Sequence, residues 1–183
     1  MVKRSGRGSF TAELPVVLLV LFMFLAFPML NLATSSVRAY FLRSAVLQAA
    51  HNAAKACDFD DDLPAEANEP ACDSAKTRAN QTLNAFKSSF SGVSLGAPNI
   101  YIVQQPINGG TATTFPDGVP KSELNDELNT YFIEISVDGQ AFPLIPMTGT
   151  IVPQVPGLTS PMNLRLSGRE MFEQTEGLAK NGT

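Results

Sequence analysis

The sequence has little of what enzymes and nucleic-acid-binding proteins use. Among 183 residues it contains one histidine, His51, and two cysteines, which make a poor set of zinc ligands. The motifs G-x-S-x-G and H-E-x-x-H and a phosphate-binding glycine loop are absent. The net charge is −4 and no basic face is formed, which argues against a nucleic-acid partner. We therefore expect no enzyme, no cofactor and no metal site, and we interpret His51 as structural rather than as a general base.

Charge is also absent from residues 14–33, LPVVLLVLFMFLAFPMLNLA, in which Asn31 is the one amide. A helix of this length covers about 30 Å, the hydrocarbon thickness of a bilayer, so the run predicts a single transmembrane helix. Lys3, Arg4 and Arg7 precede the run, and the positive-inside rule then places the N-terminus in the cytoplasm. A conventional cleaved signal peptide fits less well, because its apolar region is shorter and the helical pattern here continues past residue 33.

Two helices are predicted in the first half of the chain. The stretch after the apolar run contains no glycine or proline up to residue 57, so residues 13–57 are expected to form one helix. One predicted apolar face of this helix consists of Val37, Tyr40, Phe41, Ser44, Leu47, Ala50, Ala54 and Cys57. Pro28 is expected to kink the helix or to leave backbone groups for neighbours to satisfy. A second helix is predicted over residues 71–90, with Gly92 as its stop.

Short apolar runs separated by turns follow Gly92 and predict strands. The runs are residues 99–103, 131–137, 142–145 and 162–167. The second run alternates and ends at Asp138-Gly139, which is a hairpin signal, whereas residues 106–120 are typical of a long surface loop. The predicted fold class is α+β: a long N-terminal transmembrane helix that continues into a helical stalk, a second helix, and an antiparallel sheet of three or four strands.

The beginning of the chain carries a further pattern. A basic stub ends in Gly8, Ser9 follows, and Glu13 lies five residues after Gly8 at the edge of the apolar run. Further on come an alanine-rich helix read as RAYFLRSAVLQAAHNAAKA, the Pro-rich stretch FPLIPMTGTIVPQVPGL and the final strand NLRLSGREMFE. In this order of features the chain resembles the TadE-like minor pseudopilins of the tight-adherence (Tad/Flp) branch of type IV pilus systems. It departs from many of them in having Ser9 rather than phenylalanine after the glycine, and Pro15 so soon after the glutamate.

The resemblance implies a pilin-like fold and a part in assembling, priming or regulating a pilus. Prepilin peptidase would cut between Gly8 and Ser9, so that residues 1–8 are the leader, 9–33 the span, 34–92 the helical stalk and second helix, and 93–183 the sheet domain. The protein would lie in the bacterial inner membrane with its C-terminal domain in the periplasm, and incorporation into a pilus stays open. Its partners would be other pilins or pseudopilins, through the transmembrane helix, and the inner-membrane pilus platform.

Glu13 has two interpretations. As an assembly residue, it would pair with the new α-amino group of a neighbouring subunit. As a surface carboxylate, it would simply be favoured by the helix dipole at a helix N-terminus. An ionisable group at the edge of a membrane span usually has a function, which favours the assembly role.

Cys57 and Cys72 are the two cysteines, and in an exported domain such a pair predicts a disulfide, with two buried free thiols as the alternative. Between them, acidic residues from Asp58 to Glu69 have the spacing of a calcium-binding loop. Leu63, however, stands where that loop needs glycine. We interpret the stretch as a solvated acidic loop, with calcium binding as the alternative.

Two hypotheses from different classes follow. The first is a pseudopilin, either of the tight-adherence system or of a type II secretion or competence system. The second is a bitopic membrane protein whose outer domain binds a ligand or hydrolyses a cell-wall substrate and never polymerises. Only the first hypothesis requires removal of the leader, so the processing state discriminates between them.

Overall fold

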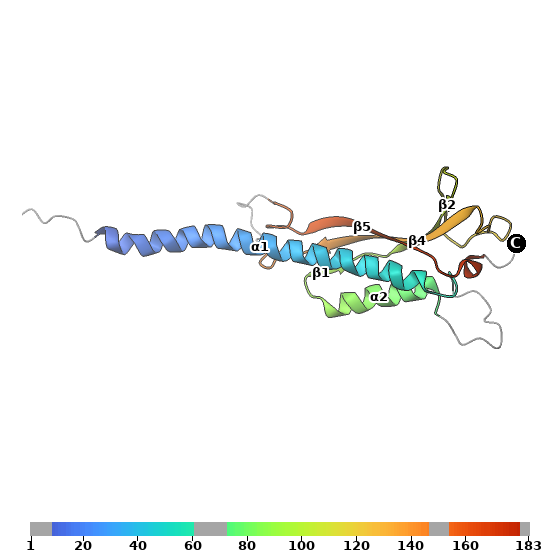
Figure 1. Ribbon diagram of the computed structural model, residues 1–183. Helices are drawn as coiled ribbons and strands as arrows, with labels where there is room; N and C mark the ends of the chain where they lie inside the picture. Colours follow the sequence, from blue (N-terminus) through green and yellow to red (C-terminus); the bar gives the residue numbers. More distant parts are fainter. Residues whose placement is uncertain (1–8, 61–72, 147–153, 180–183) are drawn as a thin grey trace, which may run out of the picture.

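The computed structural model describes residues 9–60, 73–146 and 154–179, and it places one long helix along a small domain that also contains a second helix and an antiparallel sheet (Figure 1). Helix α1, Ser9–Ala54, has 46 residues, which corresponds to about 69 Å at about 1.5 Å per residue. Pro15 and Pro28 both lie inside it, and the helix continues through them without a break. The α+β class and the long N-terminal helix are therefore confirmed.

The remaining elements follow α1 in the order helix, strands, short helix. They are α2 (Ala75–Ser89), β1 (Val93–Leu95), β2 (Asn99–Pro106), β3 (Thr113–Phe115), β4 (Asn129–Ala141), β5 (Met162–Met171) and the 3₁₀ helix η1 (Thr175–Leu178). Helix α2 begins later than predicted, because the Ser74 side chain caps it by accepting a hydrogen bond from the backbone N–H of Thr77. The helix ends at Ser89, ahead of the predicted stop at Gly92.

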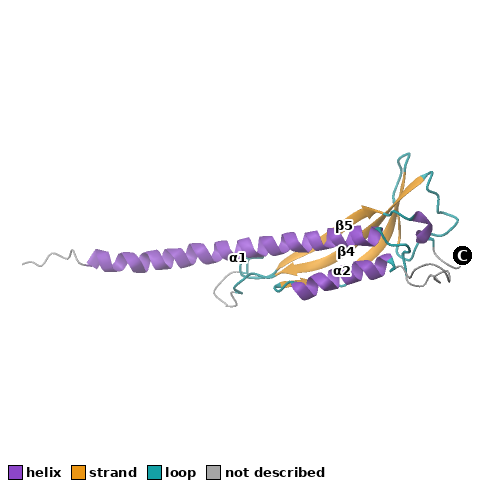
Figure 2. Ribbon diagram, turned by 60° about the horizontal axis from the view of Figure 1, so that its bottom comes forward, coloured by secondary structure: helices purple, strands orange, loops and turns teal. Residues whose placement is uncertain are grey.

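The long strand β4 is the centre of the sheet. Strand β5 pairs with one edge of β4, while β2 and then β1 pair with the other edge, and β3 extends the sheet beyond β2. All of these pairings are antiparallel. As in any strand, alternate residues of β4 point to opposite faces of the sheet. Tyr131, Ile133, Ile135 and Val137 are buried on one of these faces. Helix α1 packs against β4 and β5 and lies beside α2 (Figures 1 and 2).

Four sequence predictions for the sheet were wrong in detail. The described residues form five strands rather than three or four, because β1 and β3 are only three residues long and too short to show a pattern. β3 lies inside the predicted loop 106–120. Asp138-Gly139 is not a turn but part of β4, where Gly139 lies opposite Leu95 of β1 and Leu164 of β5. Pairing on both edges thus overrides the local turn signal. Residues 142–145, predicted as a strand, follow the end of β4 and form none.

The predicted apolar face of α1 was only partly right: its alanines Ala50 and Ala54 are buried, but its large members are not. Val37, Tyr40, Phe41 and Leu47 from that face are exposed, with Tyr40 reaching 70% exposure. The buried face overlaps the predicted one at these two alanines and has mostly small side chains, namely Leu42, Ala45, Val46, Ala49, Ala50, Ala53 and Ala54. Small residues face the sheet because the helix and β5 approach closely at Gly168, where an added Cβ atom would lie 2.8 Å from the backbone oxygen of Val46. The larger apolar side chains are left on the outside.

Candidate functional site

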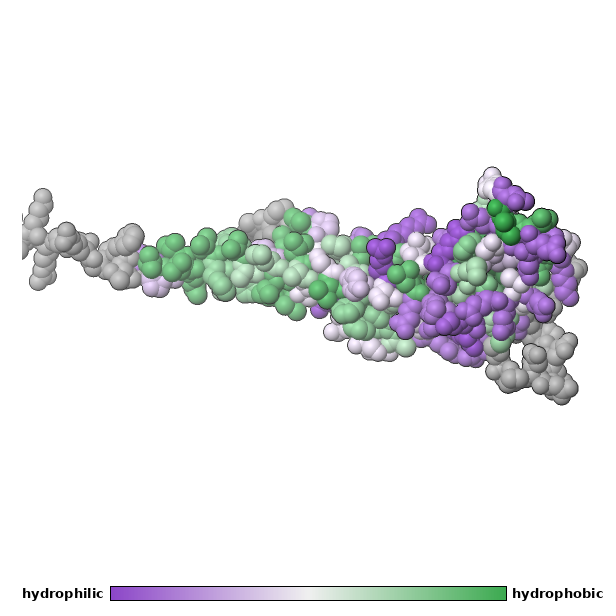
Figure 3. Space-filling model, in the orientation of Figure 1, coloured by the Kyte–Doolittle hydropathy of each residue, from purple (hydrophilic) through white to green (hydrophobic). Residues whose placement is uncertain are grey.

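The most exposed apolar surface of the molecule is the N-terminal half of α1. Every large apolar residue from Leu14 to Leu25 is exposed, as are Met29, Leu30 and Leu32. Within the described residues this is the one helix that is long and apolar enough to cross a membrane, judged by length and composition. Figure 3 shows this surface as a green shaft that continues onto the adjoining end of the domain, whereas the opposite end is mostly hydrophilic. A helix that is apolar all round requires an apolar environment or other helices.

The residues predicted for processing and assembly lie at the tip of this shaft. Gly8 is outside the described residues, and Ser9 is the first residue of α1. Glu13 follows about one helical turn later and is exposed. Cleavage between Gly8 and Ser9 and the assembly role of Glu13 stay predictions. The geometry adds that Ser9 and Glu13 belong to the same continuous helix, about 6 Å apart along its axis.

A polar junction interrupts the apolar shaft at Asn31, whose side chain is 0% exposed. Its Nδ2 donates hydrogen bonds to the backbone oxygens of Ile145 (3.0 Å) and Leu158 (2.9 Å), and its Oδ1 accepts one from the backbone N–H of Ile145 (3.0 Å). One turn later the buried Ser35 Oγ donates to the backbone oxygen of Gly157 at 2.7 Å. Two successive turns of α1 are therefore hydrogen-bonded through their side chains to the backbone of the Pro-rich stretch.

Arg38 makes a further contact of this kind, about one turn after Ser35. Its Nη1 donates to the backbone oxygen of Phe142 at 2.5 Å. Gly92 has a φ of +76°, and an added Cβ there would lie 2.3 Å from the Arg38 guanidinium carbon, so the chain between α2 and β1 passes directly over the guanidinium group. Sequence reasoning missed this junction. The sequence offered two signals, the lone amide in the apolar run and the prolines of the distant segment. Neither of them indicates that the two regions are in contact.

An aromatic row lies next on the outside of the helices. The ring centroids are 6.2 Å apart for Tyr40 and Phe41, 5.2 Å for Phe41 and Phe90, and 4.5 Å for Phe86 and Phe90. Tyr40, Phe41 and Phe90 are all exposed. The row joins the C-terminal end of α2 to α1 and extends the apolar surface past the junction.

The described residues do not assemble a catalytic or metal-binding constellation. His51 Nδ1 lies 3.7 Å from Glu170 Oε1 on the surface, with 51% and 47% of the two side chains exposed, which is an ion pair only when the histidine is protonated. No group of three or more His, Cys, Asp or Glu in the described ranges is placed to hold a metal ion. On the sheet face away from α1, Tyr101 donates to Glu134 at 2.8 Å, and burial together with this bond raises the pKa of Tyr101.

The cysteine and calcium predictions fall largely on residues that the structure does not describe. Cys57 follows the end of α1, but Cys72 lies outside the described residues, so the disulfide stays a prediction. Most of the acidic stretch also lies outside them. Of its described carboxylates, Asp60 accepts a hydrogen bond from Lys76 Nζ at 2.6 Å, and both side chains are partly exposed. This is the arrangement of a solvated ion pair.

Comparison with known proteins identifies no relative: no protein-family model matches the chain, and neither a curated protein nor a solved structure is significantly similar to it.

Proposed function

We propose that this protein is a membrane-anchored pseudopilin that takes part in the assembly, priming or regulation of a pilus-type fibre. The observation that carries the proposal is the difference between the two halves of α1. One half exposes apolar side chains in every direction, and the other half is the spine of a folded domain, without a break between them. A helix built in this way can be covered by lipid in one state and by neighbouring helices in another.

The finer assignment, to the TadE-like proteins of the tight-adherence system, is supported by the order of sequence features alone. These are the basic stub, Gly8, Glu13, the apolar run and the alanine-rich continuation. In the proposed topology the N-terminus is cytoplasmic, the domain lies outside the inner membrane, and prepilin peptidase, other pilins and the pilus platform are the partners. The competing proposal is a bitopic protein that never polymerises.

Glu13 gives the pseudopilin proposal a specific chemistry. Cleavage after Gly8 creates an α-amino group on Ser9 that is largely protonated at neutral pH. A carboxylate that enters the hydrocarbon without a partner is destabilised by a few kcal/mol or more. In water the same pair contributes about 0–1 kcal/mol. A neighbouring subunit's Ser9 amine that neutralises Glu13 inside a helix bundle would therefore set the register in which subunits join.

The first expected result concerns processing. Protein isolated from its native membrane should have Ser9 as its first residue, because prepilin peptidase cuts after the glycine of the basic stub. Intact-mass measurement checks this directly. A chain that still begins at Met1 in cells with active prepilin peptidase would contradict the pseudopilin proposal and favour the bitopic protein.

The second expected result concerns Glu13. Glu13→Gln should leave membrane insertion and removal of the leader intact while abolishing co-purification with other pilins and fibre formation, because the amide cannot neutralise an ammonium group. Glu127→Gln is the matched control, since Glu127 is an exposed glutamate in the sheet domain, and it should change neither readout. Normal pilin contacts and normal fibres in the Glu13 variant would reduce Glu13 to an interfacial surface charge.

A further inference from the structure

The polar junction lies at a defined depth on α1. From Leu14, where the apolar run begins, to Asn31 the helix rises about 26 Å, and the hydrocarbon layer of a bilayer is about 30 Å thick. Tilt of the helix would bring Asn31 slightly deeper. A span that begins at Leu14 therefore places Asn31, and with it the backbone of Ile145 and Leu158, at the far edge of the hydrocarbon layer.

Irregular backbone at that depth needs partners for its polar groups, because water is scarce there. Residues 154–161, named here with residues 142–146 as the collar segments, meet this requirement for most of their N–H groups. Val155 N–H donates to Thr159 Oγ1 at 2.7 Å, and the N–H groups of residues 157–160 all donate to backbone oxygens within the segment. Pro156 and Pro161 have no N–H to satisfy.

The collar carbonyls that face α1 are satisfied by its side chains. Asn31 donates hydrogen bonds to the carbonyl oxygens of Ile145 and Leu158. Ser35 donates to that of Gly157, and Arg38 donates to that of Phe142. Pro143 and Pro146 again lack donors. Both collar segments follow an irregular path, yet the N–H groups of Phe142, Ile145, Val155 and residues 157–160 all have partners within the protein, as a loop at the edge of a bilayer requires.

The collar segments also expose apolar side chains at the same level. Leu144 is 51% exposed, Ile145 38% and Val155 42%. They continue the apolar surface of the shaft onto the domain, as Figure 3 shows for the adjoining end of the molecule. The exposed rings of Tyr40 and Phe41 lie about 13 to 15 Å further along α1 than Asn31, and aromatic side chains are enriched at membrane–water interfaces.

We infer that the collar segments rest in the bilayer interface, with Leu144, Ile145 and Val155 among the lipid headgroups and upper acyl chains, so that the domain sits on the membrane rather than standing clear of it on a stalk. This inference rests on the proposed crossing of the membrane by α1. Its partner is the lipid surface itself, identified by the depth of the junction and by the apolar surface that continues from the shaft onto the collar segments.

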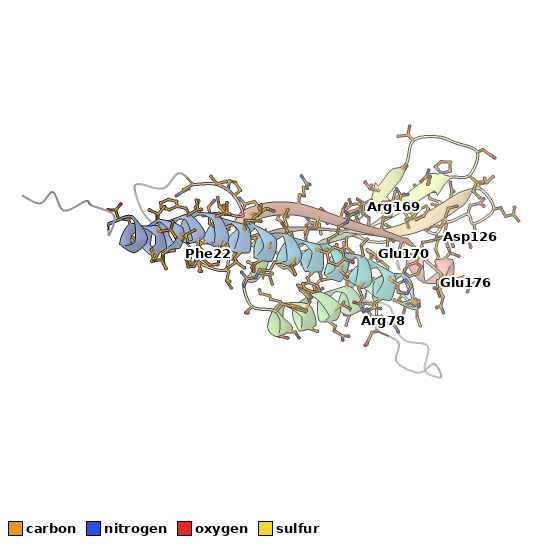
Figure 4. All side chains as sticks on the ribbon, turned by 60° about the vertical axis from the view of Figure 1, so that its left-hand side comes forward. Phe22, Arg78, Asp126, Arg169, Glu170 and Glu176 are labelled. Carbon is orange, nitrogen blue, oxygen red and sulfur yellow. The ribbon has the colours of Figure 1, made fainter. Side chains whose placement is uncertain are left out.

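The absence of tryptophan from the chain allows a direct test with single-tryptophan variants of the full-length protein in phosphatidylcholine–phosphatidylglycerol vesicles. Ile145→Trp and Val155→Trp report on the collar segments, and both positions are exposed, so the larger ring fits on the surface. Phe22→Trp reports on the middle of the shaft, where Phe22 is exposed on the N-terminal half of α1 (Figure 4). Leu128→Trp, just before β4, is the matched exposed control at the opposite end of the domain.

Quenching of the tryptophan fluorescence by lipids brominated at different depths then reports the depth of each tryptophan in the bilayer. We expect strong loss of emission for Ile145→Trp and Val155→Trp with bromines high on the acyl chain, for Phe22→Trp with bromines deep in the chain, and none for Leu128→Trp. Collar variants that are as unquenched as Leu128→Trp, with Phe22→Trp quenched, would overturn the inference and leave the anchor intact. Collar emission that is blue-shifted, insensitive to brominated lipid and altered by diluting the protein in lipid would also overturn it, because a second copy would then cover the surface. An unquenched Phe22→Trp would overturn both the inference and the anchor.

Discussion

Asn31→Leu is expected to detach the collar segments from α1 and to lower the free energy of unfolding by about 3 kcal/mol or more, since each buried polar group left without a partner costs about 1–3 kcal/mol. Leucine has nearly the shape of asparagine, so the packing is retained while three hydrogen bonds are lost. The N–H and C=O groups of Ile145 and the C=O of Leu158 would then face an apolar side chain where the native structure has the fully buried Asn31.

Two neighbouring variants calibrate this effect. Ser35→Ala removes one buried hydrogen bond to Gly157 and should lower stability by about 1–3 kcal/mol. Ser36→Ala removes an exposed hydroxyl that bonds only within the helix, to Leu32, and should have almost no effect. Denaturant unfolding in detergent followed by circular dichroism gives the stabilities, and proteolysis of the collar segments gives a local readout. An Asn31→Leu protein as stable and as protease-resistant as Ser36→Ala would show that the junction contributes nothing to the fold.

The features that could be predicted from the sequence are those that depend on residues close together along the chain. The long helix follows from an apolar run and an alanine-rich continuation, and the alternation in residues 131–137 marks the centre of β4. These patterns are local, so they do not depend on what the elements later pack against.

What sequence reasoning missed depends on distant partners. The role of Asn31 requires Ile145, which is 114 positions away, and nothing near Asn31 indicates that partner. The buried face of α1 was misassigned because large apolar side chains normally mark the core side of a helix. Here the core side consists mostly of small residues that allow close approach to β5, with Leu42 and Val46 among them, and most of the large ones are left outside. That reversal is itself informative, since apolar surface left outside on a small domain commonly marks a site of interaction with protein or membrane.

Gly168 is the strand residue that makes this reversal possible, and Gly168→Val should lower the free energy of unfolding by about 3 kcal/mol, at the upper end of the range for overpacked cores. Its Cβ atom would lie 2.8 Å from the carbonyl oxygen and 3.1 Å from the carbonyl carbon of Val46, and 3.3 Å from the Ala50 Cβ. Two of these atoms belong to the backbone of α1, which cannot move aside as a side chain could. Either α1 lifts off the sheet or β5 bends away from it.

The matched control is the adjacent residue of the same strand. Ser167 is exposed, so Ser167→Val adds the same β-branched side chain to β5 without meeting α1, and the strand should tolerate it or gain slightly from it. Unfolding midpoints measured side by side separate the contact with α1 from the effect of valine in a strand. If α1 lifts off, the Asn31 junction should loosen as well, because the same rigid helix carries both contacts, and the collar segments of Gly168→Val should be cut faster by protease than those of Ser167→Val. Equal midpoints and equal cleavage for the two variants would contradict a helix held tightly against β5, and with it the account of why the large apolar residues of α1 face outward.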